Sequence, residues 1–431
     1  MRSRNLIALT ATLGVLLAAG ALSAASNEQA LAELDVDRLV DEAVRNNPEI
    51  LAARGKAQAA REKVPQAGAL EDPMLGVGVT NLPTNFSFED DDMTQKEVSV
   101  TQKLPFPGKR GLARAMTEKD ADAAEIEIAE TRTRIVREVK TAYYELSHVY
   151  RTMEVTRRNQ QTLEGLARIA EARYALGGGM QQELLAAQLE ISRMLDELLM
   201  LDQNRIATEA RLEGLLNREV TGSLGRPAAM RFNRVPLDTR RLQQAAVESN
   251  PGLMRMRKMI EARRKGVESA ERDAFPDFEV RLSYGQRDDS PNGENRKDMV
   301  SGMVGVTIPI FYGSRQGPKI AEARAELHST EARYTAMRNE VTAMVAGMTA
   351  MVQRLERQVD LYESGILPQA RLQSQSTLSA YTVNRTEFAG LLESHIRLHR
   401  YELDYHQALT DYEKNLAILD AAVGERVGGI Q

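Results

Sequence analysis

The sequence predicts a mainly α-helical chain that also carries membrane β-strands, arranged as two tandem copies of one unit. Landmarks recur at spacings of about 203 to 207 positions, long stretches lack proline and glycine, and two pairs of short runs alternate apolar with small or polar residues. Such a spacing is far above the ~20 to 50 residues of a solenoid repeat, so the repeated unit is a whole half of the protein. Each half should contain a helix, a strand hairpin, a long helix, a tip and a returning helix.

The landmarks keep the same order in both halves. They are residues 43–48 and 246–251, residues 72–73 and 275–276, residues 104–108 and 308–313, and finally Tyr174 and Tyr381, each ten positions before a Leu-Leu pair. We therefore divide the chain into a first repeat of residues 26–225 and a second repeat of residues 226–431.

The composition favours long exposed helices over globular domains. Aromatic residues make up only 5% of the 431 residues, charged residues 27%, and tryptophan is absent. The net charge of -5 provides no basic surface, so nucleic acid is not an expected partner. The absence of cysteine excludes disulfides, thiolate metal sites, a cysteine nucleophile and a lipid-anchored cysteine.

Residues 1–25 are typical of a secretory signal. Arg2 and Arg4 give a basic start, residues 6–22 an apolar core, and residues 23–25 a cleavage site of small residues. An uncleaved membrane anchor is the alternative. Beyond this segment no run approaches the ~20 apolar residues of a membrane helix, so contact with a bilayer would require strands.

The first repeat begins with a helix over about 34–66, which Pro48 is expected to interrupt. A strand hairpin over about 73–104 follows, because residues 75–79 and 98–104 alternate with period two. The acidic residues 89–92 lie in the loop between its strands.

A long helix should then run from about 112 to 174, some 60 residues or on the order of 90 Å. Its apolar residues from Val136 to Met153 are spaced by three and four. Glycines 177–179 should form the tip, over about 176–180, of an antiparallel pair with a helix over 181–216.

The sequence of the second repeat predicts the same elements in the same order. A helix covers about 238–274, and a strand hairpin covers about 277–308. A long helix begins near 320 and turns at a tip over about 381–386, and the returning helix extends to about 419. Tandem-duplicated, long antiparallel helical hairpins plus two β-hairpins per chain are therefore the predicted fold.

Four strands of roughly ten residues have the length of membrane-spanning strands, but four cannot close on themselves. Every backbone N–H and C=O must be paired in lipid, and closed membrane barrels have at least ~8 strands. Two copies would supply eight strands and three copies twelve. The alternative is that the hairpins cap a soluble, periplasmic coiled-coil adaptor or scaffold protein.

The ordered set of motifs resembles the TolC family of outer-membrane efflux proteins over essentially the whole mature chain. The residues that carry the resemblance are the signal segment, Asn47-Pro48 and Asn250-Pro251, residues 102–110 at a strand-to-helix junction, and residues 381–386 at a helical tip. The resemblance implies a homotrimer with a twelve-stranded β-barrel in the outer membrane of a Gram-negative bacterium, continuous with a periplasmic α-helical barrel. It also implies a passive exit duct that works with a periplasmic adaptor protein and an inner-membrane pump of the RND type.

Within this family, residues 105–110 resemble the branch that accompanies heavy-metal exporters of the cobalt-zinc-cadmium and copper-silver kind. Export of drugs, dyes or proteins is the alternative. Some members close the periplasmic end with acidic rings, and those positions fall here on Ala389 and Leu392. Closure by apolar packing, or by contacts of Arg385 and Tyr381, is expected instead.

The resemblance places two groups of site residues in this chain. The predicted gate and adaptor-docking residues at the tips are Gly177, Gly178, Gly179, Tyr381, Thr382, Val383, Asn384, Arg385, Thr386 and Glu387. The predicted strand-to-helix junctions contain Pro105, Pro107, Gly108, Lys109, Arg110, Pro309 and Gly313, with the two cations interpreted as snorkelling beside the membrane.

Other residues suggest chemistry more weakly. His395 and His399 are four positions apart and could bind a transition metal. However, His395 lies on the apolar face of the returning helix of the second repeat and no third ligand is apparent, so a packing role is preferred. The methionines of residues 337–351 have coiled-coil spacing, which favours core filling over copper binding. No catalytic set or cofactor fingerprint stands out, so neither an enzyme nor a cofactor is predicted.

Overall fold

The structure, a computed structural model, describes residues 33–222 and 224–429, and the predicted signal segment lies outside these residues. The chain forms two compact units. The strand-bearing unit contains residues 49–131 and 244–343, and the tip-bearing unit contains the described residues of 33–48, 132–243 and 344–431. Each unit combines segments from both halves of the chain, so the compact units cut across the repeats.

The order of elements is the same in the two halves of the chain. The first half has α2 (Val36–Asn46), α3 (Pro48–Gly68), β1 (Met74–Thr80), β2 (Gln95–Leu104), α4 (Lys109–Ala175) and α5 (Gln181–Leu216). The second has α6 (Thr239–Ser249), α7 (Pro251–Arg272), β3 (Phe278–Gln286), β4 (Met299–Val306), α8 (Gln316–Leu361), η1 (Tyr362–Ile366), α9 (Leu367–Thr382), α10 (Phe388–Val423) and η2 (Val427–Gly429). The predicted fold class of long helices with two strand hairpins is therefore confirmed.

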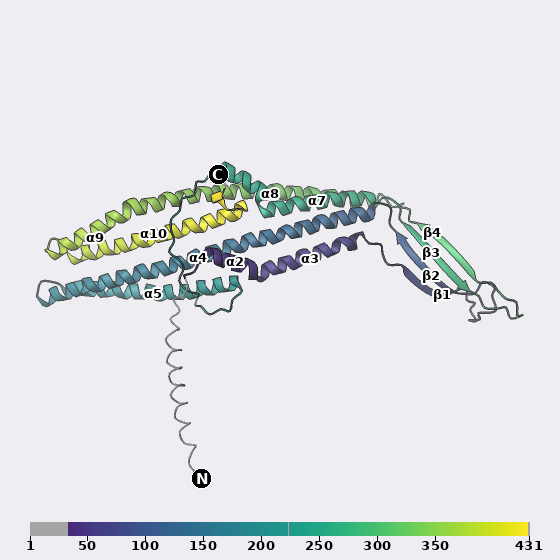
Figure 1. Cartoon of the computed structure of the whole chain (residues 1–431), viewed down its shortest axis with the longest axis horizontal. Coiled ribbons are helices and arrows are strands. Elements are labelled where there is room, and N and C mark those ends of the chain that lie inside the picture. Colours follow the sequence, from purple (N-terminus) through teal and green to yellow (C-terminus); the bar gives the residue numbers. More distant parts are fainter. Residues whose placement is uncertain (1–32, 223, 430–431) are drawn as a thin grey trace, which may run out of the picture. The chain divides into compact units, whose positions relative to one another are not determined.

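The strand-bearing unit holds one antiparallel sheet of order β1-β2-β3-β4, whose strands lie side by side in Figure 1. The two hairpins meet through β2 and β3, where Leu104 lies opposite Phe278 and Val98 opposite Tyr284. Strands β1 and β4 form the two edges of the sheet.

The sheet has two chemically different faces. One carries valine, leucine and tyrosine side chains that are largely exposed in the single chain, including Val77 at 79%, Val300 at 79% and Val304 at 69%. The other carries mainly glycine, serine and threonine, and on it Arg281 forms an ion pair of 3.1 Å with Glu97. The alternation predicted from the sequence therefore produces an apolar face that no part of residues 33–222 and 224–429 covers.

The helices of this unit meet through small residues and ion pairs. Ala57, Ala121 and Ala262 are almost fully buried. Between the helices run ion pairs such as Lys56 with Glu127 at 2.7 Å and Arg255 with Glu130 at 2.8 Å. Alanine lets the helices approach closely, whereas the exposed ion pairs contribute at most about 1 kcal/mol each. Among the helices of the described residues, none has a stretch long and apolar enough to cross a membrane.

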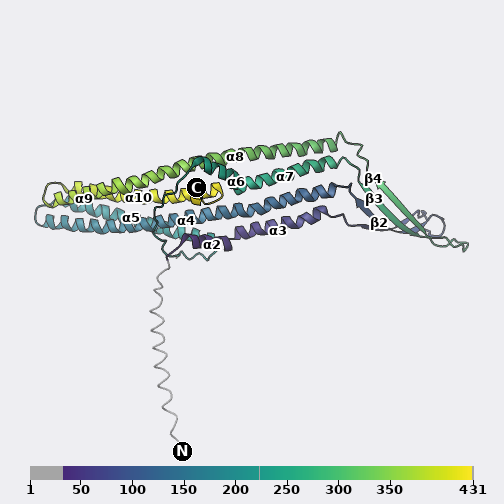
Figure 2. The same cartoon turned by 45° about the horizontal axis from the view of Figure 1, so that its top comes forward.

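In the tip-bearing unit the later part of α4, α5, α9 and α10 run together, and both helical tips lie at the same end of the unit (Figure 2). Their shared core near the tips contains Leu163, Met194, Tyr381 and Phe388, each at most 2% exposed. Further along, Tyr412 is fully buried, and its hydroxyl donates to the carbonyl of Asn233. The chain between α5 and α6 is thereby fastened to α10.

The second long helix is interrupted, which the sequence pattern did not predict. A π-helical turn, η1, separates α8 from α9, and the Leu367 amide donates to the Tyr362 carbonyl five residues back. Pro368 follows directly and cannot donate a backbone hydrogen bond to the preceding turn, so the regular ladder is broken there. In the first half, α4 continues without such a turn to Ala175.

The start of α7 yields a prediction. Asn250 caps this helix, because its side-chain oxygen accepts the Leu253 amide at 3.1 Å. Replacing Asn250 with alanine should lower the free energy of unfolding by about 1 kcal/mol. Denaturant unfolding in detergent measures this loss, with Asn292→Ala in an exposed loop as the control. Equal midpoints for the two variants would contradict the capping role.

Candidate functional site at the helical tips

Both helical tips close with the same backbone geometry. At the end of α4, Gly177 has φ +72° and the Gly178 amide donates to the Arg173 carbonyl at 3.0 Å. At the end of α9, Asn384 has φ +59° and the Arg385 amide donates to the Ala380 carbonyl at 2.8 Å. A left-handed residue with a bond spanning five positions is the Schellman termination of a helix, which glycine and asparagine favour.

The side chains of the two tips are joined by Arg173. Its guanidinium lies 4.4 Å from the centre of the Tyr381 ring, and it donates to the Tyr381 carbonyl at 3.3 Å and to the side-chain oxygen of Asn384. The Tyr381 hydroxyl in turn donates to Glu183 of α5 at 3.3 Å. We call Arg173, Glu183, Tyr381 and Asn384 the tip clamp, because they connect α4 and α5 to α9 and its tip.

The tip clamp rests on an apolar base. Tyr381 is 2% exposed and packs edge-to-face on Phe388, with the ring centres 5.7 Å apart. Burial, reinforced by the Glu183 carboxylate and opposed by Arg173, raises the pKa of the Tyr381 hydroxyl above its usual value. This hydroxyl therefore stays protonated and remains a hydrogen-bond donor throughout the physiological range.

The remaining predicted tip residues are mostly exposed. Apolar side chains stand out among and beside them, with Leu176 at 88%, Met180 at 64% and Val383 at 62% exposure. The predicted site residues that are exposed or half-exposed are Gly177, Gly178, Gly179, Thr382, Val383, Asn384, Arg385, Thr386 and Glu387. The surface that the tips present is thus partly apolar and is available for contact with another protein.

Of the two residues expected to make closing contacts, Tyr381 belongs to the tip clamp and Arg385 does not. Arg385 is exposed, and its guanidinium has no partner among residues 33–222 and 224–429, whereas Arg173 occupies the face of the Tyr381 ring. Sequence reasoning missed Arg173 and Glu183 because each contacts a residue about 200 positions away. The signal available in the sequence was that Arg173 and Glu183, which have opposite charges, lie on either side of glycines 177–179.

His395 and His399 lie in the seam between α4 and α10. Both are at least 93% buried, and Asn159 contacts His399 Nδ1 at 2.8 Å. The carboxylate nearest to His399 Nε2 belongs to Glu197, 3.9 Å away. Within the described part of the chain, no three histidine or acidic side chains are placed to hold a metal ion. The geometry fits the packing role better than metal binding.

Two further histidines lie in the same seam. His148 of α4 is half-buried, and His406 of α10 accepts a hydrogen bond from Arg151 at 3.3 Å. Burial and the Arg151 charge lower the pKa of His406 to about 4, and burial together with His399 lowers the pKa of His395. The His395 and His406 rings are therefore neutral at neutral pH.

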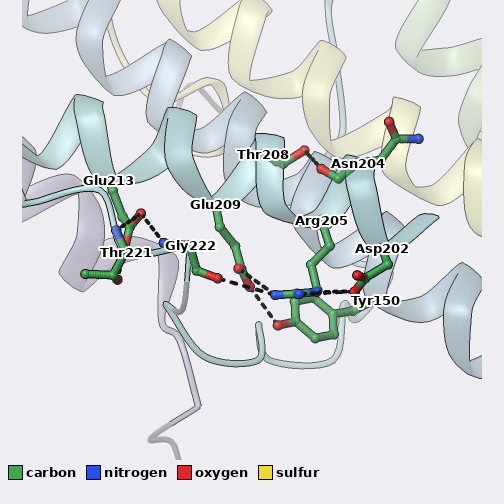
Figure 3. A network of polar contacts seen from close by, with 9 residues as sticks. All are labelled: Tyr150, Asp202, Asn204, Arg205, Thr208, Glu209, Glu213, Thr221 and Gly222. Atoms are coloured by element: carbon green, nitrogen blue, oxygen red, sulfur yellow. Dashed lines mark hydrogen bonds and ion pairs between the residues drawn. The ribbon is translucent and has the colours of Figure 1, made fainter. Parts of the chain in front are cut away.

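A polar network in the same unit fastens α5 to α4 (Figure 3). Glu209, fully buried, accepts bonds from Tyr150 at 2.7 Å and from Arg205 at 2.8 Å. Glu213 accepts the Gly222 amide at 2.9 Å, which holds the loop after α5. A cavity of about 460 Å³ lies beside this network, but the guanidinium of Arg205 is already bound by internal carboxylates. We assign the network a structural role.

The first strand-to-helix junction, in the strand-bearing unit, is closed by contacts within the chain. Lys109 donates to Asp277 and to the Phe275 carbonyl, both at 2.8 Å, and its side chain is only 12% exposed. Phe106 stacks on Phe275 with the ring centres 4.8 Å apart. Lys109 thus binds internally and does not snorkel, and Arg110 donates to the Gly68 carbonyl at 2.8 Å.

The other predicted junction residues lie in the two turns after β2 and β4. Gly108 has φ +97°, a value that favours glycine at this position, between the half-buried Pro105 and the first residue of α4. Pro107 is exposed beside it. After β4, Pro309 is half-buried and Gly313 is exposed.

Comparison with known proteins places these features in a family. The family model described as "Outer membrane efflux protein" matches residues 39–218 and 242–425. The chain is 22% identical to outer membrane protein TolC of Vibrio cholerae serotype O1, over 94% of this chain and 93% of that protein.

Its fold is similar to two solved structures. For the outer membrane protein VceC from Vibrio cholerae the TM-score is 0.77 at 18% identity, over 92% of this chain and 98% of VceC. For CusC the TM-score is 0.76 at 19% identity, over 92% of this chain and 93% of CusC. At these identities the two structures support the fold.

The histidine seam yields a prediction about pH. The pKa of His406 is lower in the folded chain than the 6.5 of a free histidine, so its contribution to stability is complete above pH 6.5 and is lost as the pH falls towards about 4. The loss is on the order of 3 kcal/mol. Glutamine keeps an acceptor for Arg151 but does not titrate, so His406→Gln should flatten the acid-side fall of the melting temperature. The exposed His328→Gln variant should behave as wild type, and an unchanged profile for His406→Gln would contradict the assignment.

Proposed function

Because this chain belongs to the outer membrane efflux protein family, we propose that it is the exit duct of a tripartite efflux system, in which its tips dock a periplasmic adaptor and an inner-membrane pump drives transport. Family membership makes the protein an outer-membrane efflux channel of the TolC type, with its helical part in the periplasm. Channels of this family are not enzymes. In this proposal the chain conducts the substrate, closes the channel at the helical tips and docks the adaptor.

The observation that carries the proposal is the uncovered apolar face of the sheet. Leaving its valines and leucines in water costs about 25 cal/mol for each Å² of exposed apolar surface, whereas the hydrocarbon of a bilayer removes this cost. The opposite face, rich in glycine and serine, suits a water-filled lumen. This pairing of faces is what a membrane strand requires.

Exposed apolar stripes on the tip-bearing unit support assembly of several copies. Leu189 and Leu199 of α5 are 59% and 72% exposed, and Leu361 and Leu372 on α8 and α9 are 57% and 68% exposed. Such stripes on different faces fit a heterologous contact that closes into a ring. The family implies a trimer. We propose that these stripes pack against neighbouring copies.

We propose that the tip clamp holds the closed state and that the exposed tip surface receives the adaptor. The pump is of the RND type in this proposal. Opening would separate the pair α9 and α10 from the pair α4 and α5, and the π-helical turn η1 gives the long helix formed by α8 and α9 a point at which to bend. The long helix α4 has no such turn and would act as the fixed partner.

For the substrate we propose heavy-metal cations, because residues 105–110 resemble the branch of the family that accompanies heavy-metal exporters. The cations would be transported and would not be resident cofactors. Drugs, dyes and proteins are the alternatives. Resistance of a strain that lacks the gene, with and without a plasmid copy, distinguishes them: a loss confined to zinc, cadmium, copper or silver salts supports metal export, and a loss confined to dyes or drugs rejects it.

Two tip variants test the docking role. Gly178→Pro removes the amide that closes the first tip, and Arg385→Glu reverses an exposed charge on the second. Both should reduce resistance to the level of the strain lacking the gene while the detergent-resistant trimer still forms. Arg240→Glu, away from the tips, is the control. Full resistance in both tip variants would reject the docking role.

The tip clamp predicts a closed channel that opens more readily without Arg173. Arg173→Ala removes a cation–π contact and two hydrogen bonds, together worth about 1 to 2 kcal/mol, so the open fraction should rise roughly 5- to 30-fold. Single-channel recording in planar bilayers measures this fraction. Arg168→Ala, an exposed neighbour on α4, should leave it unchanged. Equal open fractions in both variants would exclude the clamp as a closing contact.

A further inference from the structure

The polar face of the sheet, which carries mainly glycine, serine and threonine, also holds an ion pair in the middle of its strands. Glu97 of β2 lies between Gly78 of β1 and Gly285 of β3, whereas Arg281 of β3 lies opposite Thr101. Thr101 and Glu97 are four positions apart on β2, so the two charged residues begin about 13 Å apart along the strands. Only a long side chain that lies along the sheet can join them.

Arg281 spans this distance by lying flat on the face. Its guanidinium donates to the Ser99 hydroxyl at 3.2 Å and to the Glu97 carboxylate at 3.1 Å. The carboxylate also accepts the Thr80 hydroxyl at 2.7 Å. Gly76, opposite Ser99, leaves room for this arrangement, because a Cβ there would lie 2.8 Å from the Ser99 hydroxyl oxygen. Small residues around the pair therefore allow the guanidinium to reach Glu97.

The two partners of the pair are exposed to different extents. The side chain of Arg281 is 43% exposed and that of Glu97 is 17% exposed. A solute beside the face therefore has more access to the guanidinium than to the carboxylate. At distances several times their separation, two opposite unit charges nearly cancel. The intact pair thus adds little net charge to the face, although each partner alone would add a full unit.

The other charged side chains of this face lie towards the ends of the strands. Lys103 and Glu279 are opposite each other near the end of the sheet that leads into the helices. The acidic residues 89–92 lie in the loop beyond the other end. On the polar face between these ends, Glu97 and Arg281 are the charged residues of the four described strands. The charge in the middle of the face therefore depends on this pair.

From this geometry we propose that Glu97 and Arg281 determine the charge preference of the channel lumen: as a pair they keep the middle of its wall close to neutral, so that solutes of either sign pass. The inference rests on the proposed channel function, in which the polar face lines the lumen. Without Glu97, each copy of the chain would present an unpaired guanidinium that attracts anions and repels cations. Glu97 is then the residue that admits cationic cargo past Arg281.

The reactivity of a nearby cysteine measures the local charge, and the natural chain has no cysteine to interfere. Ser301 of β4 is exposed on the same face, about 10 Å or two strand spacings from Ser99. The Ser301→Cys variant in isolated outer membranes is treated with a cationic and with an anionic methanethiosulfonate reagent of similar size. The ratio of the two rates cancels the reactivity of the thiolate itself. At low ionic strength, where the Debye length is ~30 Å, this ratio reports the charge of the wall.

The two partners predict shifts of opposite sign. In the Ser301→Cys chain, Glu97→Gln should move the ratio roughly 2- to 4-fold towards the anionic reagent, and Arg281→Gln by a similar factor towards the cationic one. The double variant Glu97→Gln with Arg281→Gln should return to the starting ratio. Arg281→Lys keeps the charge and should keep the ratio, as should Lys96→Gln on the apolar face.

Either single variant that assembles in the membrane is sufficient for the test, because each predicts its own sign. An unchanged ratio in an assembled Glu97→Gln or Arg281→Gln variant, or shifts of the same sign in both, would overturn the inference.

A cysteine on the other face separates this inference from the proposed function. Val300 is next to Ser301 in the chain but lies on the apolar face, so lipid should protect Val300→Cys from both charged reagents. Rapid reaction of Val300→Cys in intact outer membranes would overturn the proposed channel function. Protection of Val300→Cys together with an unchanged ratio at Ser301→Cys would overturn only the role of the ion pair.

Discussion

The unpaired edges of β1 and β4 are the constraint on which the rest of the structure depends. A four-stranded sheet with one apolar face is unstable in water and cannot end in lipid, because each edge exposes backbone groups that lipid cannot pair. Within one chain the sheet has no partner for either edge among the described residues. In the proposed channel, copies of the chain supply those partners.

The two halves are alike in fold but differ at their tips, where we propose that the channel closes. Both tips end in the same Schellman turn, yet Tyr381 is buried and held by Arg173, whereas its counterpart Tyr174 is 48% exposed. The second rod also contains the π-helical turn before Pro368. In the proposed opening, the pair α4 and α5 stays fixed. The pair α9 and α10, which follows the π-helical turn, moves, and the tip clamp restrains it.

Much of the fold followed from local sequence signals. Period-two alternation identified both hairpins, and the break at Pro48 and the glycines at 177–179 appear where the pattern suggested. The π-helical turn was missed because the apolar stripe continues through it, although Pro368 within a helical pattern was a usable sign. The tip clamp and the buried Glu209 could not be predicted, because their partners are set by how distant helices pack and not by spacing along the chain.

The central claim is that copies of this chain close one continuous sheet in the membrane. Electron cryo-microscopy of the protein in lipid nanodiscs measures this directly. The account predicts three copies around one axis, with twelve strands in a closed wall and β4 of each copy beside β1 of the next. A particle in which the four strands of each chain fold back on that chain's own helices, with no strand contact between copies, would contradict it.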